Sequence, residues 1–179
     1  MDQPCELCFG DSISTQRIHP YGVELCETCA RGLMPDLLEQ RGIRLKSTIR
    51  TVGASDGPDQ SEHVVTASIP SLGGKFAFTQ RSLLGNLLEL LTRPRRVGDP
   101  VFDDNVTASG TPSETLDRAL SSDGFQSAVL ELAVAASFTV VNGELAWTCE
   151  RPERDDQLLR DARRSAAVVL HHLEQAART

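Results

Sequence analysis

The sequence predicts an α+β protein in which a small N-terminal module precedes a larger domain with a mostly antiparallel sheet. Three observations predict this fold class. Four of the five cysteines lie in the first 42 residues, as two pairs. After Gly42 the hydrophobic period changes from that of a helix to that of a strand, which indicates a domain boundary. A long amphipathic pattern then ends the chain. We therefore expect a module over residues 1–42 and an α+β domain over residues 43–179 with a long C-terminal helix.

The module contains two CxxC pairs, Cys5 with Cys8 and Cys26 with Cys29, separated by seventeen residues. Two such pairs supply the four thiolates of a tetrahedral structural Zn²⁺ site. The intervening residues predict a short hairpin that turns over residues 19–22. The second pair opens a helical pattern, and a helix N-terminus favours thiolates. A hairpin followed by a helix that carries the second pair forms a treble-clef zinc finger. The sequence therefore predicts one Zn²⁺ held by these four cysteines.

Other interpretations of the cysteines stay open. Four thiolates can also hold an iron–sulfur cluster. A thioredoxin-like redox pair is less favoured, because neither CxxC follows a strand in a βαβ pattern. His19 has the chemistry to replace one cysteine ligand, but its position in a turn favours the surface. Cys149 has no partner nearby in the sequence, so we expect a small, half-buried strand residue there.

The segment CELCFGDSISTQRIHPYGVELCETCARGL resembles the N-terminal zinc-binding domain of ClpX-type Clp protease ATPases. That family has CxFCGKS, a hairpin with a Gly-Pro turn, and YICDECV leading into a helix. Cys5, Cys8, Cys26 and Cys29 fall on its four metal ligands. The resemblance covers about thirty residues and implies a zinc-binding finger that dimerises and binds adaptors. No GxxxxGK[ST] motif follows, so the chain is not such an ATPase. The spacing also resembles that of GATA-type DNA-binding fingers, which are basic.

Charge argues against nucleic acid and membranes as partners. The chain has a net charge of -7, and the predicted finger has seven acidic residues against three arginines. Phosphate contacts need a basic surface instead. The longest apolar stretch, residues 128–141, is shorter than the ~20 residues of a membrane helix. No signal peptide is visible, so we expect a cytoplasmic protein, in which paired cysteines indicate metal or redox chemistry rather than disulfides.

The first half of the domain predicts strands and one helix. IRLKSTIRTV alternates from Ile43 and predicts a strand, followed by an acidic, turn-rich loop over residues 53–62. HVVTASIP and GKFAFTQR, separated by SLGG, predict a hairpin. Residues 82–92 predict an amphipathic helix. A loop follows, and then a strand is predicted around VFDDNVTAS.

The second half predicts helices around one hairpin. ETLDRAL predicts one or two helical turns, and DGFQSAVLELAVAAS predicts a buried helix that starts near a cap at Asp123. SFTVV and ELAWTCE flank Asn142-Gly143, which favours a type I′ turn. We expect Trp147, on the second strand of this hairpin, to lie in the core.

The C-terminal run from Glu153 predicts a long helix whose first turn carries Asp155 and Asp156, where they suit the helix dipole. His171 and His172 are adjacent and therefore point about 100° apart. We expect at least one of them on the surface and no shared metal. The predicted apolar stripe consists of Leu159, Ala162, Ala166, Val169 or Leu170, Leu173 and Ala177.

Residues 98–110, GDPVFDDNVTASG, resemble a GDPxFD signature of uncharacterised bacterial proteins. In those proteins the motif leads into a strand, a helix, a hairpin and a final helix, an order that this chain follows from about Val97. The resemblance implies an α+β domain and supplies no catalytic residues.

The same motif carries Asp99, Asp103 and Asp104, a carboxylate cluster that with Arg96 could form the site of a metal-dependent hydrolase. The favoured interpretation is structural: Asp99 forms a turn, and Asp103 or Asp104 satisfies backbone groups. The basic spot of Arg93, Arg95 and Arg96 is interpreted as a solvated loop rather than a phosphate site.

The favoured function is that of a non-enzymatic zinc-binding protein, a protein–protein interaction or regulatory adaptor module, for which no catalytic residues are predicted. A small finger cannot bury all its apolar residues, and we expect Tyr21 and Met34 in an exposed patch with an acidic rim. The alternative is that this patch packs on the chain's own domain over residues 43–179. Such a patch suits a protein partner or self-association and repels phosphate. The alternatives are an enzyme with its site at Asp99, Asp103 and Asp104, and a nucleic-acid-associated regulator.

Overall fold

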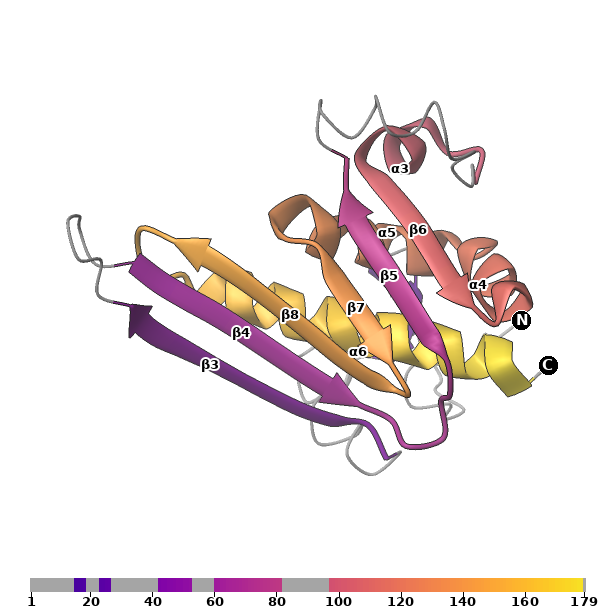
Figure 1. Ribbon diagram of the computed structural model, residues 1–179, viewed down its shortest axis with the longest axis horizontal. Helices are drawn as coiled ribbons and strands as arrows, with labels where there is room; N and C mark the ends of the chain where they lie inside the picture. Colours follow the sequence, from indigo (N-terminus) through magenta and orange to yellow (C-terminus); the bar gives the residue numbers. More distant parts are fainter. Residues whose placement is uncertain (1–14, 19–22, 27–41, 53–59, 82–96, 179) are drawn as a thin grey trace.

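The computed structural model describes residues 42–52, 60–81 and 97–178, together with the backbone of residues 15–18 and 23–26. Figure 1 shows the arrangement of its elements. The strands are β1 (Thr15–Ile18), β2 (Val23–Cys26), β3 (Arg44–Val52), β4 (Gln60–Ser68), β5 (Lys75–Gln80), β6 (Val106–Thr111), β7 (Phe138–Val141) and β8 (Glu144–Arg151). The described helices are α3 (Pro100–Asn105), α4 (Ser113–Leu120), α5 (Asp123–Ala135) and α6 (Asp156–Arg178).

In the N-terminal region, β1 and β2 form an antiparallel pair. Ile18 lies opposite Val23 and Thr15 opposite Cys26. This confirms the antiparallel pairing of the two strands predicted between the cysteine pairs, whereas the turn predicted over residues 19–22 lies outside the described residues. The rest of the predicted finger lies outside the described residues.

The larger domain is built on a six-stranded sheet with the order β3-β4-β8-β7-β5-β6, in which every neighbouring pair is antiparallel. This confirms the predicted α+β class with a mostly antiparallel sheet and a long C-terminal helix. It also shows that the predicted hairpin between residues 63–70 and 74–81 is wrong. β4 and β5 are not neighbours, because β8 and β7 lie between them.

β4 and β5 are separated because the β4–β5 connection makes backbone hydrogen bonds with the tip of the β7–β8 hairpin. That tip has positive φ at Asn142 (48°) and Gly143 (77°), as expected for the predicted Asn-Gly turn. The Ile69 N–H donates to the Gly143 carbonyl over 2.9 Å, and the Asn142 N–H donates to the Gly74 carbonyl over 2.7 Å. A Cβ on Gly143 would lie 2.1 Å from the Ile69 carbonyl oxygen, so only glycine permits this approach.

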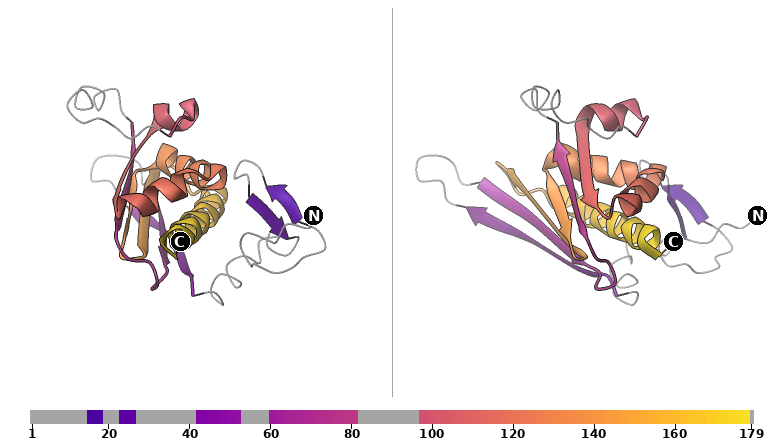
Figure 2. Two further views of the ribbon diagram at one scale, coloured as in Figure 1. Left: turned by 90° about the vertical axis from the view of Figure 1, so that its right-hand side faces the viewer. Right: turned by 45° about the vertical axis from the view of Figure 1, so that its right-hand side comes forward.

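Helices α4, α5 and α6 cover one face of the sheet, as the two views of Figure 2 show. The core lies between the two layers. Trp147 is buried there, and its Nε1–H donates to the Leu132 carbonyl over 3.0 Å. Phe78 stacks on Phe138 at a centroid distance of 4.8 Å and meets the edge of Phe125 at 5.8 Å. The prediction that Trp147 is a core residue is confirmed.

Two local predictions near helix starts are wrong. A strand was expected around residues 101–109, but α3 occupies Pro100–Asn105 and β6 begins only at Val106. The Asp99 carboxylate accepts hydrogen bonds from the N–H groups of Val101 and Phe102, and this cap starts a short helix before the strand. Ser122, not Asp123, precedes α5, and its side chain makes no capping bond. Asp123 is instead the first residue of that helix.

Helix α6 confirms most of the predicted stripe, except that Ala176 rather than Ala177 is buried. His171 and His172 are both buried, so the expectation that at least one is on the surface is wrong. The cause is that α6 packs on β3 and β4 and also on α4 and α5, which covers a wide arc of the helix. Helix α6 is too polar to cross a membrane, and no other described helix has the required length and hydropathy. The helix predicted over residues 82–92 lies outside the described residues.

Candidate binding surface

The predicted zinc ligands lie almost entirely outside the described residues. Cys26 is the last residue of β2, described by its backbone alone, whereas Cys5, Cys8 and Cys29 fall outside. The zinc site therefore stays a prediction.

The acidic motif of the domain binds its own backbone. Asp99 caps α3, and the two carboxylate oxygens of Asp103 accept hydrogen bonds from the N–H groups of Val97 (2.8 Å) and Gly98 (3.0 Å). Asp104 is exposed, and Arg96 lies outside the described residues. Within the described ranges, no three His, Cys, Asp or Glu side chains lie together as a metal site would require. Asp99 and Asp103 thus have the structural role that the favoured interpretation predicted.

Three buried histidines also have structural surroundings. His63, on the inner side of β4, accepts a hydrogen bond at Nε2 from the Asp155 N–H over 2.8 Å and so holds the start of α6. The rings of His171 and His172 meet edge to face at a centroid distance of 5.4 Å. Burial lowers the pKa of His172 to about 4, so its imidazole is neutral at pH 7. A metal shared by His171 and His172 was not expected; one would need a third donor, and no group of three potential ligands occurs in the described part of the chain.

The outer face of the sheet, the face away from α4, α5 and α6, is covered by no helix that the structure describes (Figure 2). Residues alternate along each strand, so the inward residues are buried and their neighbours, which form the outer face, are exposed. Cross-strand pairs form two continuous rows over all six strands. One row is Arg44, Ser68, Glu144, Val141, Lys75 and Thr111. The next row is Lys46, Thr66, Ala146, Thr139, Ala77 and Ser109.

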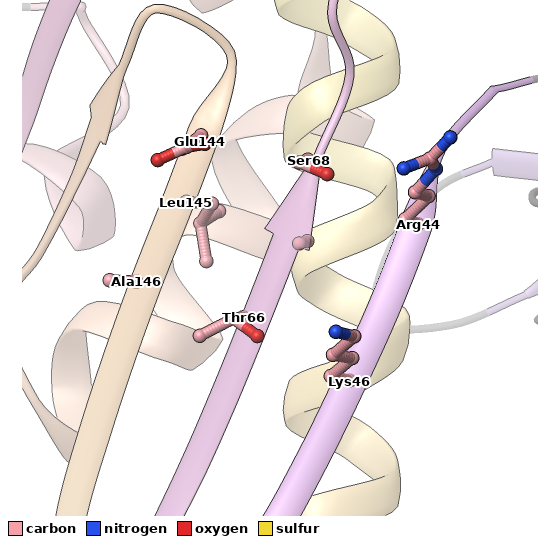
Figure 3. A pocket seen from close by; sticks show the side chains of 8 residues that line it. Arg44, Lys46, Thr66, Ser68, Glu144, Leu145 and Ala146 are labelled. Atoms are coloured by element: carbon pink, nitrogen blue, oxygen red, sulfur yellow. The ribbon is translucent and has the colours of Figure 1, made fainter.

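A hollow of about 310 Å³ lies at the β3 end of these rows, over β3, β4 and β8. Figure 3 shows Arg44 and Lys46 on β3 beside Ser68 and Thr66 on β4, with Glu144 on the next strand. Arg44 lies opposite Ser68 and Lys46 opposite Thr66, so each cation faces a hydroxyl rather than a carboxylate. Neither cation forms an ion pair with a residue that the structure describes. The hollow therefore offers hydrogen-bond donors and positive charge to an anionic group.

The basic character of β3 follows from its alternation. The outward positions of β3 are Arg44, Lys46, Thr48, Arg50 and Val52, so three of the five are basic. The period of IRLKSTIRTV already places these residues on one face. The pattern alone does not distinguish them as binding residues, because it does not reveal which face of the sheet the described helices leave uncovered and which strand lies at its edge.

Comparisons of the chain with models of protein families, with curated proteins and with solved structures found no match.

Proposed function

We propose that the chain is a non-enzymatic, zinc-binding adaptor protein of the cytoplasm that works by binding other proteins. Its N-terminal treble-clef finger holds one structural Zn²⁺ through Cys5, Cys8, Cys26 and Cys29. The outer face of the sheet in the second domain supplies another binding surface.

The observation that carries this proposal is the one-sided packing of the sheet. Six strands have helices on one face, while the other face presents small polar side chains interspersed with charged ones. Among the charged residues, Arg44 and Lys46 border the hollow and form no ion pair with a described residue. A broad, polar surface of this kind suits recognition of another chain, because the exposed side chains around the hollow are mainly polar, whereas small-molecule sites are lined mainly by apolar and aromatic side chains. The acidic motif argues against a hydrolase, because Asp99 and Asp103 already accept backbone hydrogen bonds.

The finger is supported by the spacing of its cysteines and by the position of the β1–β2 hairpin between the two pairs. The resemblance to the zinc-binding domain of ClpX-type ATPases points in the same direction and makes self-association through the finger a second candidate role. The net charge of -7 disfavours nucleic acid as the partner.

The zinc site is tested by elemental analysis of the full-length protein purified without added metal. We expect about one zinc per chain. Cys26→Ser should lose it, whereas Cys149→Ser, the same substitution in the sheet, should keep it. Iron accompanied by a visible charge-transfer band would contradict the proposal.

The division into two modules is tested by chelation. Metal binding should supply most of the folding free energy of the finger, of order 10 kcal/mol. The domain has its own core, so a chelator should leave its cooperative thermal transition in place. Loss of the whole transition on chelation would place both parts in a single folding unit.

A further inference from the structure

We propose that the free edge of β3 binds an acidic, extended segment of a partner protein as an added strand. This inference rests on the proposed binding role of the open sheet face and names the chemistry of the partner.

The backbone of β3 has one side on which no described strand is paired. The strand is nine residues long and pairs with β4 along its whole length, from Arg44 opposite Ser68 to Val52 opposite Gln60. In an antiparallel edge strand, alternate residues direct their N–H and C=O groups to the open side. These groups are the template on which an extended peptide adds to a sheet.

The charge of β3 favours an acidic partner. Arg44, Lys46 and Arg50 all project on the outer face, and β3 contains no acidic residue. A side chain on an added strand would stand about 5 Å from its cross-strand partner on β3. Glu144 and Glu150 on β8 would be about 14 Å away, three strand spacings, which exceeds the screening length of about 8 Å in physiological salt. An acidic peptide would therefore meet the cations of β3 with little repulsion from β8.

Within β3 the attraction is strongest at the Arg44 end. Arg50 lies opposite Glu62 of β4, whose carboxylate offsets part of its charge. Arg44 and Lys46 lie opposite hydroxyls and border the hollow, so they keep their full charge for a ligand. At the far end Val52 is 46% exposed and offers an apolar contact. The fitting peptide therefore alternates carboxylates with β-branched residues and has its carboxylates concentrated opposite Arg44 and Lys46.

A second copy of this chain fits the same edge poorly. Antiparallel pairing of two β3 strands with full overlap is centred on Thr48, and it would put Lys46 of each copy opposite Arg50 of the other. A shift of the register by two residues toward the start of the strand puts Arg44 opposite Arg50. Like charges directly opposite each other destabilise a strand pair. The charges that oppose self-pairing are the ones that favour an acidic strand.

A nucleic-acid strand fits less well than a peptide. Single-stranded nucleic acid is bound by aromatic side chains that stack on its bases, and the outward residues of β3, β4 and β8 include no aromatic ring. A nucleic-acid strand that lay across the outer face, rather than along the edge of β3, would also approach Glu62, Glu144 and Glu150, which repel phosphates.

The test titrates the full-length protein into a fluorescent nine-residue peptide in which threonine and glutamate alternate. We expect saturable binding that weakens between about 50 mM and about 500 mM salt. Lys46→Glu and Arg44→Glu should each weaken binding at least about tenfold. The matched control is Lys75→Glu, which makes the same charge change on the outer face. Lys75 lies on the same row as Arg44 but on β5. It should leave the affinity within about twofold of wild type.

Three further probes separate strand addition from general charge attraction. A peptide with lysine in place of glutamate should not bind. A peptide of the same charge with a central proline should bind weakly, because proline removes a backbone donor and interrupts the strand. A single-stranded oligonucleotide should bind more weakly than the acidic peptide.

The proposal is overturned if the acidic peptide does not bind, if the proline peptide binds as well, or if Lys75→Glu weakens binding as much as Lys46→Glu. Tighter binding of the oligonucleotide would assign this edge to nucleic acid and overturn it too. Zinc content and thermal melting of the same preparations keep this result distinct from the proposed zinc function. A protein without zinc whose β3 still binds the peptide would contradict the finger and support the strand site.

Discussion

The two faces of the six-stranded sheet use the same strands for different purposes. On the inner face Val65, Val140 and Trp147 are at most 1% exposed and pack under the helices. Their neighbours Thr66, Thr139 and Ala146 face outward and are exposed. Because successive residues of a strand point to opposite faces, one residue step separates a position that holds the fold from one that is free to bind. The inner face therefore carries the stability, and the outer face is available for function.

The largest expected loss of stability comes from a substitution at the centre of the inner face. Trp147→Ala should lower the free energy of unfolding by about 3–5 kcal/mol, because it removes the largest fully buried side chain and leaves a cavity. Urea unfolding followed by circular dichroism measures this, since the substitution removes the only tryptophan. Trp147→Phe fills most of the space and should cost less. A loss below about 1 kcal/mol for the alanine variant would contradict the position of Trp147 in the core.

The next effect concerns a titratable group under the inner face. The pKa of His172 is about 4 in the folded protein and about 6.5 in an unfolded chain. The unfolded state therefore binds more protons between these values, and stability falls as the pH drops from 6.5 to 4. The contribution of this one group reaches up to about 3 kcal/mol. Unfolding free energies at pH 7 and pH 4 should differ by that much less in His172→Leu than in wild type. Equal pH dependence in both proteins would contradict the low pKa.

His63 tests how the inner face holds the start of α6. His63→Leu keeps an apolar side chain of similar size but removes the acceptor of the Asp155 N–H. The free energy of unfolding should fall by about 0.5–1.5 kcal/mol, the net contribution of one hydrogen bond, because this bond is only partly buried and water can reach the freed N–H. Hydrogen exchange at the Asp155 amide should accelerate by more than that of amides in the middle of α6. Uniform acceleration along α6 would indicate a general loss of stability instead.

The smallest expected change in stability comes from two reciprocal substitutions at adjacent residues of β7. Thr139→Val on the outer face should change the free energy of unfolding by no more than about 0.5 kcal/mol. Val140→Thr, one residue away on the inner face, buries a hydroxyl and should cost about 1–3 kcal/mol. Thermal and urea unfolding of both variants measure the contrast. Similar effects of the two substitutions would contradict the division between the faces.

The sequence alone determined the local elements of this protein. Alternation from Ile43 predicted β3, Asn142-Gly143 predicted the β7–β8 hairpin, and the C-terminal apolar stripe predicted α6. These features depend on residues two to four positions apart, so the information lies within each segment. The cysteine spacing predicts the zinc site in the same local way, and that site stays a prediction.

Only the tertiary structure decided the order of the strands and the environment of their side chains. The β7–β8 hairpin lies between β4 and β5, because hydrogen bonds from Ile69 and Asn142 join segments far apart in the chain. His171 and His172 are both buried because helices and strands surround α6 on more than one side. Which face no described helix covers, and which strand lies at the edge of the described sheet, also depend on long-range packing. Each of these outcomes is a balance of long-range contacts, which no local pattern encodes.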